Sequence, residues 1–551
     1  MSQAAVGHGG VTEVHAARLF NASCIALTAG AAMFAITSDI MGPLKQQFIL
    51  SNEEVGMVMG WSGWGFTIGM LVLGPLCDAL GMRLLLRLAL VFHAAGVALM
   101  IFAGGFWMLL AGGIVNALGS GAVEAACNPL TATIYPDKKT HKLNQFHMWF
   151  PGGIVLGGLA CYGLDALGHA GLTSALAHAG LNLWQLKLAI VLVPTAAYGV
   201  LFTGQYFPPT ERVQSGVSFG GMFKETLLRP LFLVLLACMM LTASLELGPN
   251  RWVAPVLEAG GIPGILVLVW ITGLMAVLRL VAGPVVRWFT NTGLLLASAV
   301  VSGIGLLALS LSGSLPASGT AATVVVVGAA ATVFAFGVCY FWPTMLGVVA
   351  ERVPKGGALA LAVIGGLGGL FVNTVTTPLM GTIADKYLHR ELVFRGTVDG
   401  RAVDRERETV AVLEEVGSAY ANWSRSLGDA RQDEVTRRDI QAGLAAVTDV
   451  LDAWRSSGSL PETATANALR AAIRNGPPDS VEEGGSEAAR AALAAKKKAA
   501  AILGPADNKG GLMAFRYVAP LSIILIIAFG VMFIQDRMRG RAARSAGRET
   551  T

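Results

Sequence analysis

The sequence predicts an all-α membrane protein with twelve spanning helices. Of its 551 residues, 54% are hydrophobic and only 14% are charged, whereas about 25% of the residues in an ordinary soluble domain are charged. The mean hydropathy is +0.61, and the 68 glycines are typical of membrane helices, which tolerate glycine well. Apolar stretches of roughly 20 residues, the length that spans a bilayer, recur along the chain.

Twelve such stretches are predicted as spans: 17–43, 54–77, 83–103, 107–134, 144–166, 184–206, 230–250, 262–288, 293–313, 321–349, 357–385 and 514–536. Spans one to six and seven to twelve form two pseudo-symmetric six-helix bundles. Transporters commonly place two such halves face to face, with the substrate site near the membrane midplane. The expected organisation is an N-terminal bundle at 1–206, a cytoplasmic linker at 207–229, spans seven to eleven at 230–386, a polar insert at 387–510, and span twelve with a basic tail at 511–551.

Lysine and arginine in the short loops predict the orientation of the chain. They gather in one set of loops and in the C-terminal tail, while the opposite loops hold few, among them Lys45 and Arg251. Because positively charged loops stay on the cytoplasmic side, we expect both termini there. No cleavable signal peptide is evident, so the first span is expected to remain as an anchor. The prediction is a monomer in the inner (plasma) membrane.

Enzymatic and metal-binding functions find no support in the sequence. The six cysteines all lie in or beside apolar segments, and their spacing matches neither a disulfide framework nor a metal site. The polar insert contains no HExxH, GxSxG or P-loop pattern. The net charge of +5 gives no indication of nucleic-acid binding. We expect no cofactor and no metal.

The insert at 387–510 is predicted to be helical and to lie outside the cytoplasm. Two apolar stripes step by three and four residues, as one face of a helix does. The first comprises Leu413, Val416, Tyr420, Trp423 and Leu427, and the second comprises Ile440, Leu444, Val447, Leu451 and Trp454. They predict a helical hairpin, followed by an alanine-rich helix at 486–503. Binding of a protein partner, or a spacer role, is the favoured function.

Glu124 stands out in span four because its surroundings are apolar and small. A charged side chain near the centre of a membrane helix costs roughly 2.5–3.5 kcal/mol on insertion scales. A protein accepts such a residue where it faces a water-filled cavity or is protonated during part of a cycle. One helix face carries a polar residue every four positions: Asn116, Ser120, Glu124 and Asn128. The pattern predicts a proton-coupling carboxyl group; the alternative is a carboxylate held by a local hydrogen bond.

Asp39 is a second candidate for proton coupling. It lies in the outer part of span one, between Ser38 and Pro43. The alternative is a cap at the helix end near the membrane interface.

Glu246 is a third candidate, near the outer end of span seven. Gly248 and Pro249 follow it and are predicted to break the helix. Broken membrane helices expose backbone groups where they line a cavity. We therefore expect the substrate site to be lined by Glu246, Asn250, Arg251 and Trp252. The alternative is an interfacial pair of Glu246 with Arg251, with Trp252 as a membrane anchor.

The segment GPLCDALGMR at 74–83 resembles the GxxxDxxGxR signature of the major facilitator superfamily. The matching residues are Gly74, Asp78, Gly81 and Arg83, whereas Ala79 and Met82 stand where the family usually carries basic residues. The resemblance implies a gating and structural role for the four matching residues. Asp78 is expected to accept hydrogen bonds from the start of a neighbouring helix.

A finer resemblance joins the chain to the fucose–galactose–glucose proton symporter family. EAACNPLTATIYPDKKTHKLNQFH looks like that family's ETxxNP and RLNxxQ segments, and SDIMGP looks like its NDxxxP segment. The resemblance implies proton coupling and sugar contact for Asp39 and Glu124. Asn128, Asn144 and His147 are then expected to contact the substrate, His147 standing where the family has glutamine.

These observations together predict a proton-coupled transporter of a small polar solute, with a monosaccharide as the first candidate. Asn373 and Trp342 are the candidate contacts from the other half, and tryptophan can stack on a sugar ring or simply anchor a helix. One alternative is a carrier for a nucleoside or organic anion, for which Arg279 in span eight is the available cation. Another is a non-transporting sensor or scaffold that uses the insert.

Overall fold

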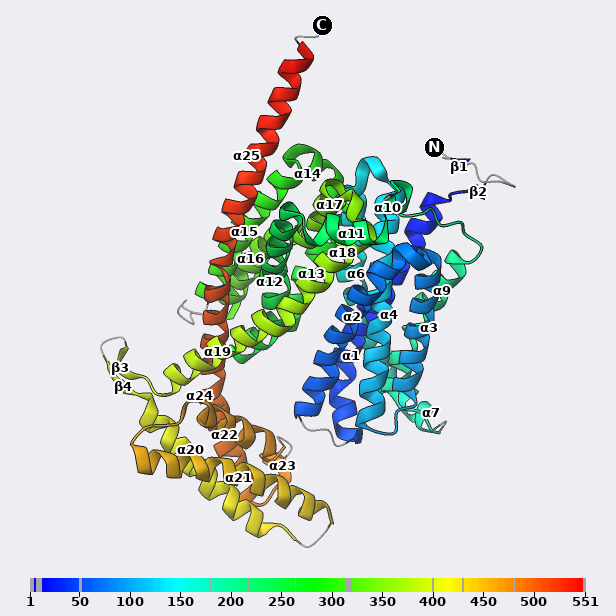
Figure 1. Cartoon of the computed structure of the whole chain (residues 1–551). Helices are drawn as coiled ribbons and strands as arrows, with labels where there is room; N and C mark the ends of the chain where they lie inside the picture. The colour runs from blue at the N-terminus through cyan, green and yellow to red at the C-terminus, as the bar shows by residue number, and fades with distance from the viewer. Residues whose placement is uncertain are drawn as a thin grey trace.

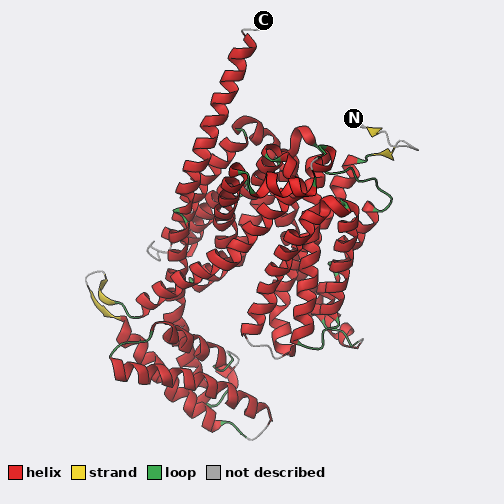
Figure 2. Ribbon diagram, in the orientation of Figure 1, coloured by secondary structure: helices red, strands yellow, loops and turns green. Residues whose placement is uncertain are grey.

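The computed structural model describes residues 4–5, 12–48, 52–178, 180–216, 218–262, 264–312, 320–398, 401–428, 431–478 and 481–548. Residues 1–3 and 6–11, before span one, lie outside this range, and so do the side chains of Ser38 and Pro43. Helices form nearly all of the molecule (Figure 2), and two short antiparallel strand pairs complete it. The all-α prediction is confirmed.

The first half consists of six spans built from eight helices. They are α1 (Ala16–Phe48), α2 (Asn52–Leu80), α3 (Met82–Ile101), α4 (Phe106–Ile134), α5 (Lys139–His147), α6 (Trp149–Leu167), α8 (Leu183–Ala189) and α9 (Leu192–Phe202). Smaller elements are β1 (Ala4–Ala5), β2 (Thr12–Glu13), η1 (Pro136–Lys138), η2 (Gly168–Leu172) and α7 (Thr173–His178). Helices α10 (Glu211–Gln214) and α11 (Phe219–Leu227) form the linker.

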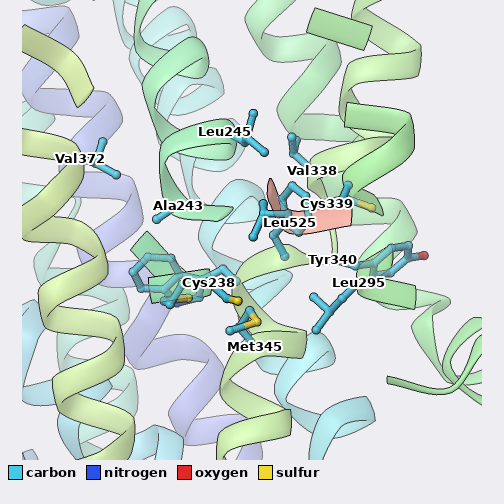
Figure 3. Close-up of a cluster of buried hydrophobic side chains, with 14 of the residues drawn as sticks. Cys238, Ala243, Leu245, Leu295, Val338, Cys339, Tyr340, Met345, Val372 and Leu525 are labelled. Carbon is cyan, nitrogen blue, oxygen red and sulfur yellow. The ribbon is translucent and has the colours of Figure 1, made fainter. Parts of the chain in front are cut away.

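The second half repeats this plan with its own helices. They are α12 (Pro230–Ala259), α13 (Gly264–Leu280), α14 (Ala282–Phe289), α15 (Asn291–Leu311), α16 (Thr320–Val338), α17 (Phe341–Arg352), η4 (Pro354–Gly356), α18 (Gly357–Phe371), η5 (Val372–Thr376), α19 (Thr377–Leu392), α24 (Glu487–Val518) and α25 (Leu521–Arg548). Its core contains side chains from most of these helices, and Figure 3 shows part of it, including Leu245, Leu295 and Leu525.

The predicted number of spans is confirmed. Eleven helical segments of the described chain are long and apolar enough to cross a membrane, and a bent pair makes twelve. That pair, α13 and α14, is span eight, and it bends by 70°. Pro284 explains the bend because it cannot donate a hydrogen bond to the carbonyl of Leu280. Arg279 lies in the last turn before the bend.

The predicted break in span seven is wrong. Helix α12 continues through Gly248 and Pro249 to Ala259. Neighbouring helices can hold a proline-containing membrane helix together, and a side-chain carbon added at Gly248 would meet Thr376 at 3.1 Å and Met380 at 3.2 Å. Gly248 is therefore a close-packing position. Because the helix is longer than predicted, Glu246 lies near its middle rather than near its outer end.

The insert is a helical domain with a hydrophobic core of its own. It comprises β3 (Arg395–Val398), β4 (Arg401–Asp404), α20 (Arg405–Ser426), α21 (Arg431–Ser457), α22 (Glu462–Asn475), α23 (Val481–Gly484) and the first part of α24. In the strand pair, Val398 lies opposite Arg401. Both predicted apolar stripes face the core. Helix α22 was not predicted. Helix α24 passes through residue 510 without a break, so a continuous helix leads from the insert into span twelve.

Figure 1 shows how these parts are arranged. Both termini lie at the same end of the molecule, and the insert projects from the opposite end. The ribbons of the two halves converge toward the end with the termini. Helices α2 and α18 pack closely where the halves meet: a side-chain carbon at Gly74 would clash with Ala362, and one at Gly365 would lie 2.9 Å from Met70.

Candidate functional site

Glu124 lies in the interior of the first half, on α4. Its exposed fraction is 4%. Its Oε2 accepts a hydrogen bond of 3.1 Å from Nδ2 of Asn128, one helical turn further along the same helix. The four-residue spacing seen in the sequence therefore places these two polar side chains in contact, because residues i and i+4 are neighbours on a helix.

His147 continues this polar contact from a second helix. It ends α5 and is 2% exposed. Its Nε2 lies 2.9 Å from Oδ1 of Asn128. Because the Asn128 amide nitrogen already faces Glu124, its oxygen accepts, and Nε2 of His147 is the donor. The resemblance-based grouping of Glu124, Asn128 and His147 therefore corresponds to one hydrogen-bonded cluster.

Arg279 extends the cluster across the interface between the halves. Its Nη1 donates to the backbone carbonyl of His147 at 3.0 Å, and its Nε donates to the carbonyl of Cys339 at 2.5 Å. Its Nη2 donates to Oε1 of Glu246 at 2.7 Å. Both charged side chains are at most 4% exposed. We call the run Glu124, Asn128, His147, Arg279 and Glu246 the central polar chain.

Two acceptor oxygens near this chain are buried without a hydrogen-bond partner in the described part of the structure. They are Oε2 of Glu246 and Oδ1 of Asn144. The Nδ2 of Asn144 donates to Thr344 of the second half at 3.3 Å. An unsatisfied buried acceptor costs about 1–3 kcal/mol, so both oxygens favour contact with a hydroxyl group or water.

Besides Glu246, four more site residues were predicted from the second half: Asn250, Trp252, Trp342 and Asn373. Trp342 is buried at the start of α17, with its ring near Gly365. Trp252 is half-buried against Gly381, and Asn250 is half-buried with an unpaired Oδ1. Asn373 lies in the π-helical turn η5 and accepts a hydrogen bond of 2.5 Å from Nη1 of Arg251.

The alternative expectation, an interfacial pair of Glu246 with Arg251, is therefore wrong. Glu246 pairs with Arg279, and Arg251 donates to Asn373. Glu246 and Arg251 lie at different heights along the longer helix α12, because Arg251 is five residues, or more than one helical turn, beyond Glu246.

Asp39 does not join the central polar chain. Its Oδ2 lies 2.6 Å from Nζ of Lys187, and the same ammonium lies 2.7 Å from Oδ1 of Asp165. Asp39 is in α1, Asp165 is in α6 and Lys187 is in α8. The structure therefore places the two predicted proton-coupling acids in different surroundings: Glu124 beside an amide and Asp39 beside an ammonium.

A family model for the major facilitator superfamily matches residues 19–374. The chain belongs to this superfamily. The match runs from the first span into η5, so it includes the whole central polar chain. Membership makes the protein a multi-pass membrane transporter and not an enzyme.

Solved superfamily structures share the fold. An E. coli fucose:proton symporter, FucP, superimposes with a TM-score of 0.53 at 17% identity, covering 66% of this chain and 92% of that one. The proton:xylose symporter XylE gives a TM-score of 0.51 at 14% identity, covering 68% and 90%.

Sequence relatives of this superfamily member include hexose transporters HXT13 and HXT17 of Saccharomyces cerevisiae. Each is 28% identical over 119 residues, which is 21% of this chain. The match also spans only 21% of the length of each yeast protein.

In this transporter, further contacts join the halves at the end that carries the termini. Thr140 donates to Oε1 of Glu351 at 2.8 Å, and Lys139 donates to the carbonyl of Ala350 at 3.4 Å. Lys139 also pairs with Glu211 of the linker at 2.6 Å. These contacts hold the two bundles and the linker together at this end.

The residues of the superfamily signature lie beside the same contacts. Asp78 accepts a hydrogen bond from the hydroxyl of Thr210, the residue directly before α10 in the linker. Gly81 has φ of 84° at the turn between α2 and α3, a conformation that glycine adopts without strain. Arg83 is exposed. Gly74 lies against Ala362 of α18.

Sequence reasoning missed three polar residues of the first half that lie within its helices. Lys187 and Asp165 form the cluster with Asp39, and His93 contacts Tyr198 and Ser120 at 3.1 Å each. Charge within an apolar span was the available signal, since such residues generally have a partner. The partner of Lys187 is 148 positions away, and spacing along one helix does not reveal it.

Proposed function

We propose that the protein is a proton-coupled transporter of a small polar solute, with a monosaccharide as the first candidate, and that it works by alternating access. Glu124 carries the proposal. It is a buried carboxyl in a membrane protein, and among the described residues its hydrogen-bond partner is a neutral amide. Such a group can exist as a neutral acid at a lower cost than one that is paired with a cation.

Glu246, which also belongs to the central polar chain, lies in a different environment from that of Glu124. Its partner Arg279 is permanently charged, and the two side chains lie 2.7 Å apart in a buried position. Protonation of Glu246 would leave a buried guanidinium without its counter-ion, which is unfavourable. Glu246 therefore stays ionised, and Glu124 is the acid of the central polar chain that changes its protonation.

The central polar chain links this protonation to the contact between the halves. An ionised Glu124 only accepts hydrogen bonds, whereas a protonated one also donates. Protonation therefore changes the hydrogen bond between Glu124 and the Asn128 amide and, through Asn128, the hydrogen bond to His147. The backbone of His147 is bound by Arg279 from the other half. Proton uptake thus acts on a contact that must break when the halves rock apart.

The charge of the site favours a neutral solute rich in hydroxyl groups. Arg279, the cation considered for anion transport, already donates to two carbonyls and to Glu246. The free acceptors Oε2 of Glu246 and Oδ1 of Asn144 match hydroxyl donors. The names of FucP, XylE and the yeast hexose transporters support a sugar.

The distribution of basic residues supports an orientation with both termini and the linker in the cytoplasm and the insert outside, in the inner (plasma) membrane. With the halves joined near the termini, this conformer would be closed to the cytoplasm. The transporter is proposed to act as a monomer.

The function is tested in proteoliposomes that contain the purified protein. Labelled monosaccharides are offered with an inward proton gradient, without a gradient, and with a gradient collapsed by an ionophore. We expect at least one sugar to accumulate only when the gradient is intact. Equal accumulation in all three conditions would contradict proton coupling, and movement of nucleosides or organic anions instead would contradict the substrate class.

A second candidate is a sensor or scaffold that works through the insert. The independent hydrophobic core of α20–α24 favours it, since a packed domain of this kind can present a surface to a protein partner. A complete absence of solute movement in the same assay, with intact folded protein, would support this alternative.

A further inference from the structure

Two tyrosines and an arginine meet where the second half joins the insert. The hydroxyl oxygens of Tyr387 on α19 and Tyr517 on α24 lie 2.6 Å apart, so one hydroxyl donates a hydrogen bond to the other. The guanidinium carbon of Arg390 lies 5.0 Å from the centre of the Tyr387 ring, and its charge also acts on the Tyr517 hydroxyl. We call Tyr387, Arg390 and Tyr517 the junction cluster.

The junction cluster lies where the apolar outer surface of the bundle ends. Leu379 precedes it on α19, and Ile523 and Ile524 follow it at the start of α25; all three side chains are exposed. Arg390 is exposed, and Tyr517 is 52% exposed. Exposed leucine and isoleucine on membrane helices face lipid tails, whereas tyrosine and arginine are typical of the headgroup level. We therefore expect the cluster at the membrane surface on the side of the insert.

Three acidic residues that border the cluster on α19 and α24 are paired with other cations. Glu391 pairs with Arg405, at the start of α20. Asp385 and Asp507 both pair with Arg470 of α22, at 3.4 Å and 2.8 Å. These carboxylates thus bind arginines of the insert, and the arginine of the junction cluster contacts an aromatic ring instead.

The junction cluster presents hydrogen-bond donors that suit a phosphate group. The two tyrosine hydroxyls carry two protons, and their mutual hydrogen bond uses one of them, so the other can be donated to a ligand. A guanidinium can stack on an aromatic face and still donate two parallel N–H bonds to a phosphate. A positive charge and a hydroxyl donor therefore lie together at the expected level of the lipid headgroups.

We propose that the junction cluster binds the headgroup phosphate of an anionic phospholipid in the leaflet next to the insert. Arg390 and the available tyrosine hydroxyl hold the phosphate, and the acyl chains lie along the apolar surface that contains Leu379 and Ile523. This apolar surface favours a lipid over a free phosphate ion. A zwitterionic lipid binds less well, because its own cation offsets the attraction to Arg390. The bound lipid fastens the base of the insert to the membrane surface, whatever solute the protein transports.

Native mass spectrometry of the purified, delipidated full-length protein tests the proposal. Phosphatidylglycerol or phosphatidylcholine is titrated in detergent, and the fraction of lipid-bound protein is measured. We expect phosphatidylglycerol to bind more tightly than phosphatidylcholine. Arg390→Gln should weaken its binding by about tenfold or more, because hydrogen bonds to charged groups contribute strongly. The double variant Tyr387→Phe with Tyr517→Phe, which removes both hydroxyls, should weaken it several-fold.

Arg455→Gln is the matched control, because it removes the same charge from an arginine of α21 that is 56% exposed. Thermal unfolding before lipid is added shows that each variant is folded, and the control should bind phosphatidylglycerol as the wild type does. Equal weakening in Arg390→Gln and Arg455→Gln, or equal affinity for the two lipids, would overturn the proposal. Displacement of phosphatidylglycerol by an equal concentration of inorganic phosphate would assign the cluster to free phosphate and reject the lipid.

Discussion

Arg279 and Glu246 form a buried ion pair at the point where the two halves of the transporter meet. The guanidinium donates to Glu246 at 2.7 Å within the second half and to the carbonyl of His147 at 3.0 Å in the first half. One side chain thus pairs with a buried acid and connects the two bundles. The pair has consequences for stability that differ from those of an exposed ion pair.

Replacement of Arg279 by methionine should destabilise the protein strongly. The change leaves the Glu246 carboxylate buried without its partner, and loss of one member of a buried pair costs about 3–5 kcal/mol. The double variant Arg279→Met with Glu246→Gln removes the stranded charge and should recover a large part of this loss. Thermal unfolding in detergent measures both effects.

Arg455→Met is the matched control, because Arg455 pairs with Asp452 on the exposed face of α21 and both side chains are more than half exposed. An exposed pair contributes about 0–1 kcal/mol. Equal unfolding temperatures for Arg279→Met and Arg455→Met would show that the pair is not important for stability.

The contact of Gly74 with Ala362 predicts a compensating pair of substitutions. A side-chain carbon at Gly74 would clash with the side chain of Ala362 on α18, and overpacking typically costs 1–3 kcal/mol. Gly74→Ala should therefore oppose closure between α2 and α18 and slow uptake several-fold. Adding Ala362→Gly restores the space and should restore the initial uptake rate.

Gly158 on α6 is the control for this pair, since a carbon added there meets no atom within 4 Å. Gly158→Ala should transport as the wild type does. If Gly74→Ala is slow and Ala362→Gly brings no recovery, close approach of these two helices is not what limits the rate.

Sequence patterns predicted the helices of this fold better than they predicted the contacts between helices. Hydropathy located the spans because a bilayer requires about 20 apolar residues regardless of tertiary partners. The spacing of Glu124 and Asn128 foretold their contact because both lie on one helix face. The pairing of Glu246 with Arg279, and of Asp39 with Lys187, depends on how separate helices pack, which no local pattern contains.

The wrong prediction for span seven has a related cause. Pro249 removes a backbone donor, and local rules alone favour a break. Packing of Gly248 against Thr376 and Met380 holds the helix straight enough to continue to Ala259. In span eight, Pro284 does interrupt the helix. The helix continues at one proline and is interrupted at the other because their packing neighbours differ, and those neighbours can be identified only from the structure.

The insert should lose stability at alkaline pH through Tyr420. Its hydroxyl donates to the carbonyl of Ala472 at 2.5 Å, and burial raises the pKa of Tyr420 above its ordinary value. Since the folded pKa is higher than the unfolded one, this contribution is complete below pH about 10 and declines as the pH rises further. Limited proteolysis of the full-length protein, with cleavage within the insert read by mass spectrometry, follows the decline.

Tyr420→Phe provides the comparison for this alkaline effect. It removes both the hydrogen bond, worth about 1 kcal/mol, and the ionisable group. The variant should be slightly more sensitive to protease at neutral pH, and its sensitivity should rise less between neutral and alkaline pH. The same alkaline rise in both proteins would exclude Tyr420 as its source.

The most direct test of the account is a comparison of accumulation and exchange in Glu124→Gln. Glutamine preserves the size of the side chain and keeps an oxygen that can accept from Asn128, but it cannot carry a proton. The account predicts that the variant exchanges labelled sugar for unlabelled sugar across proteoliposomes and no longer accumulates sugar in a proton gradient. Accumulation equal to that of the wild type would contradict the proton-coupling role of Glu124.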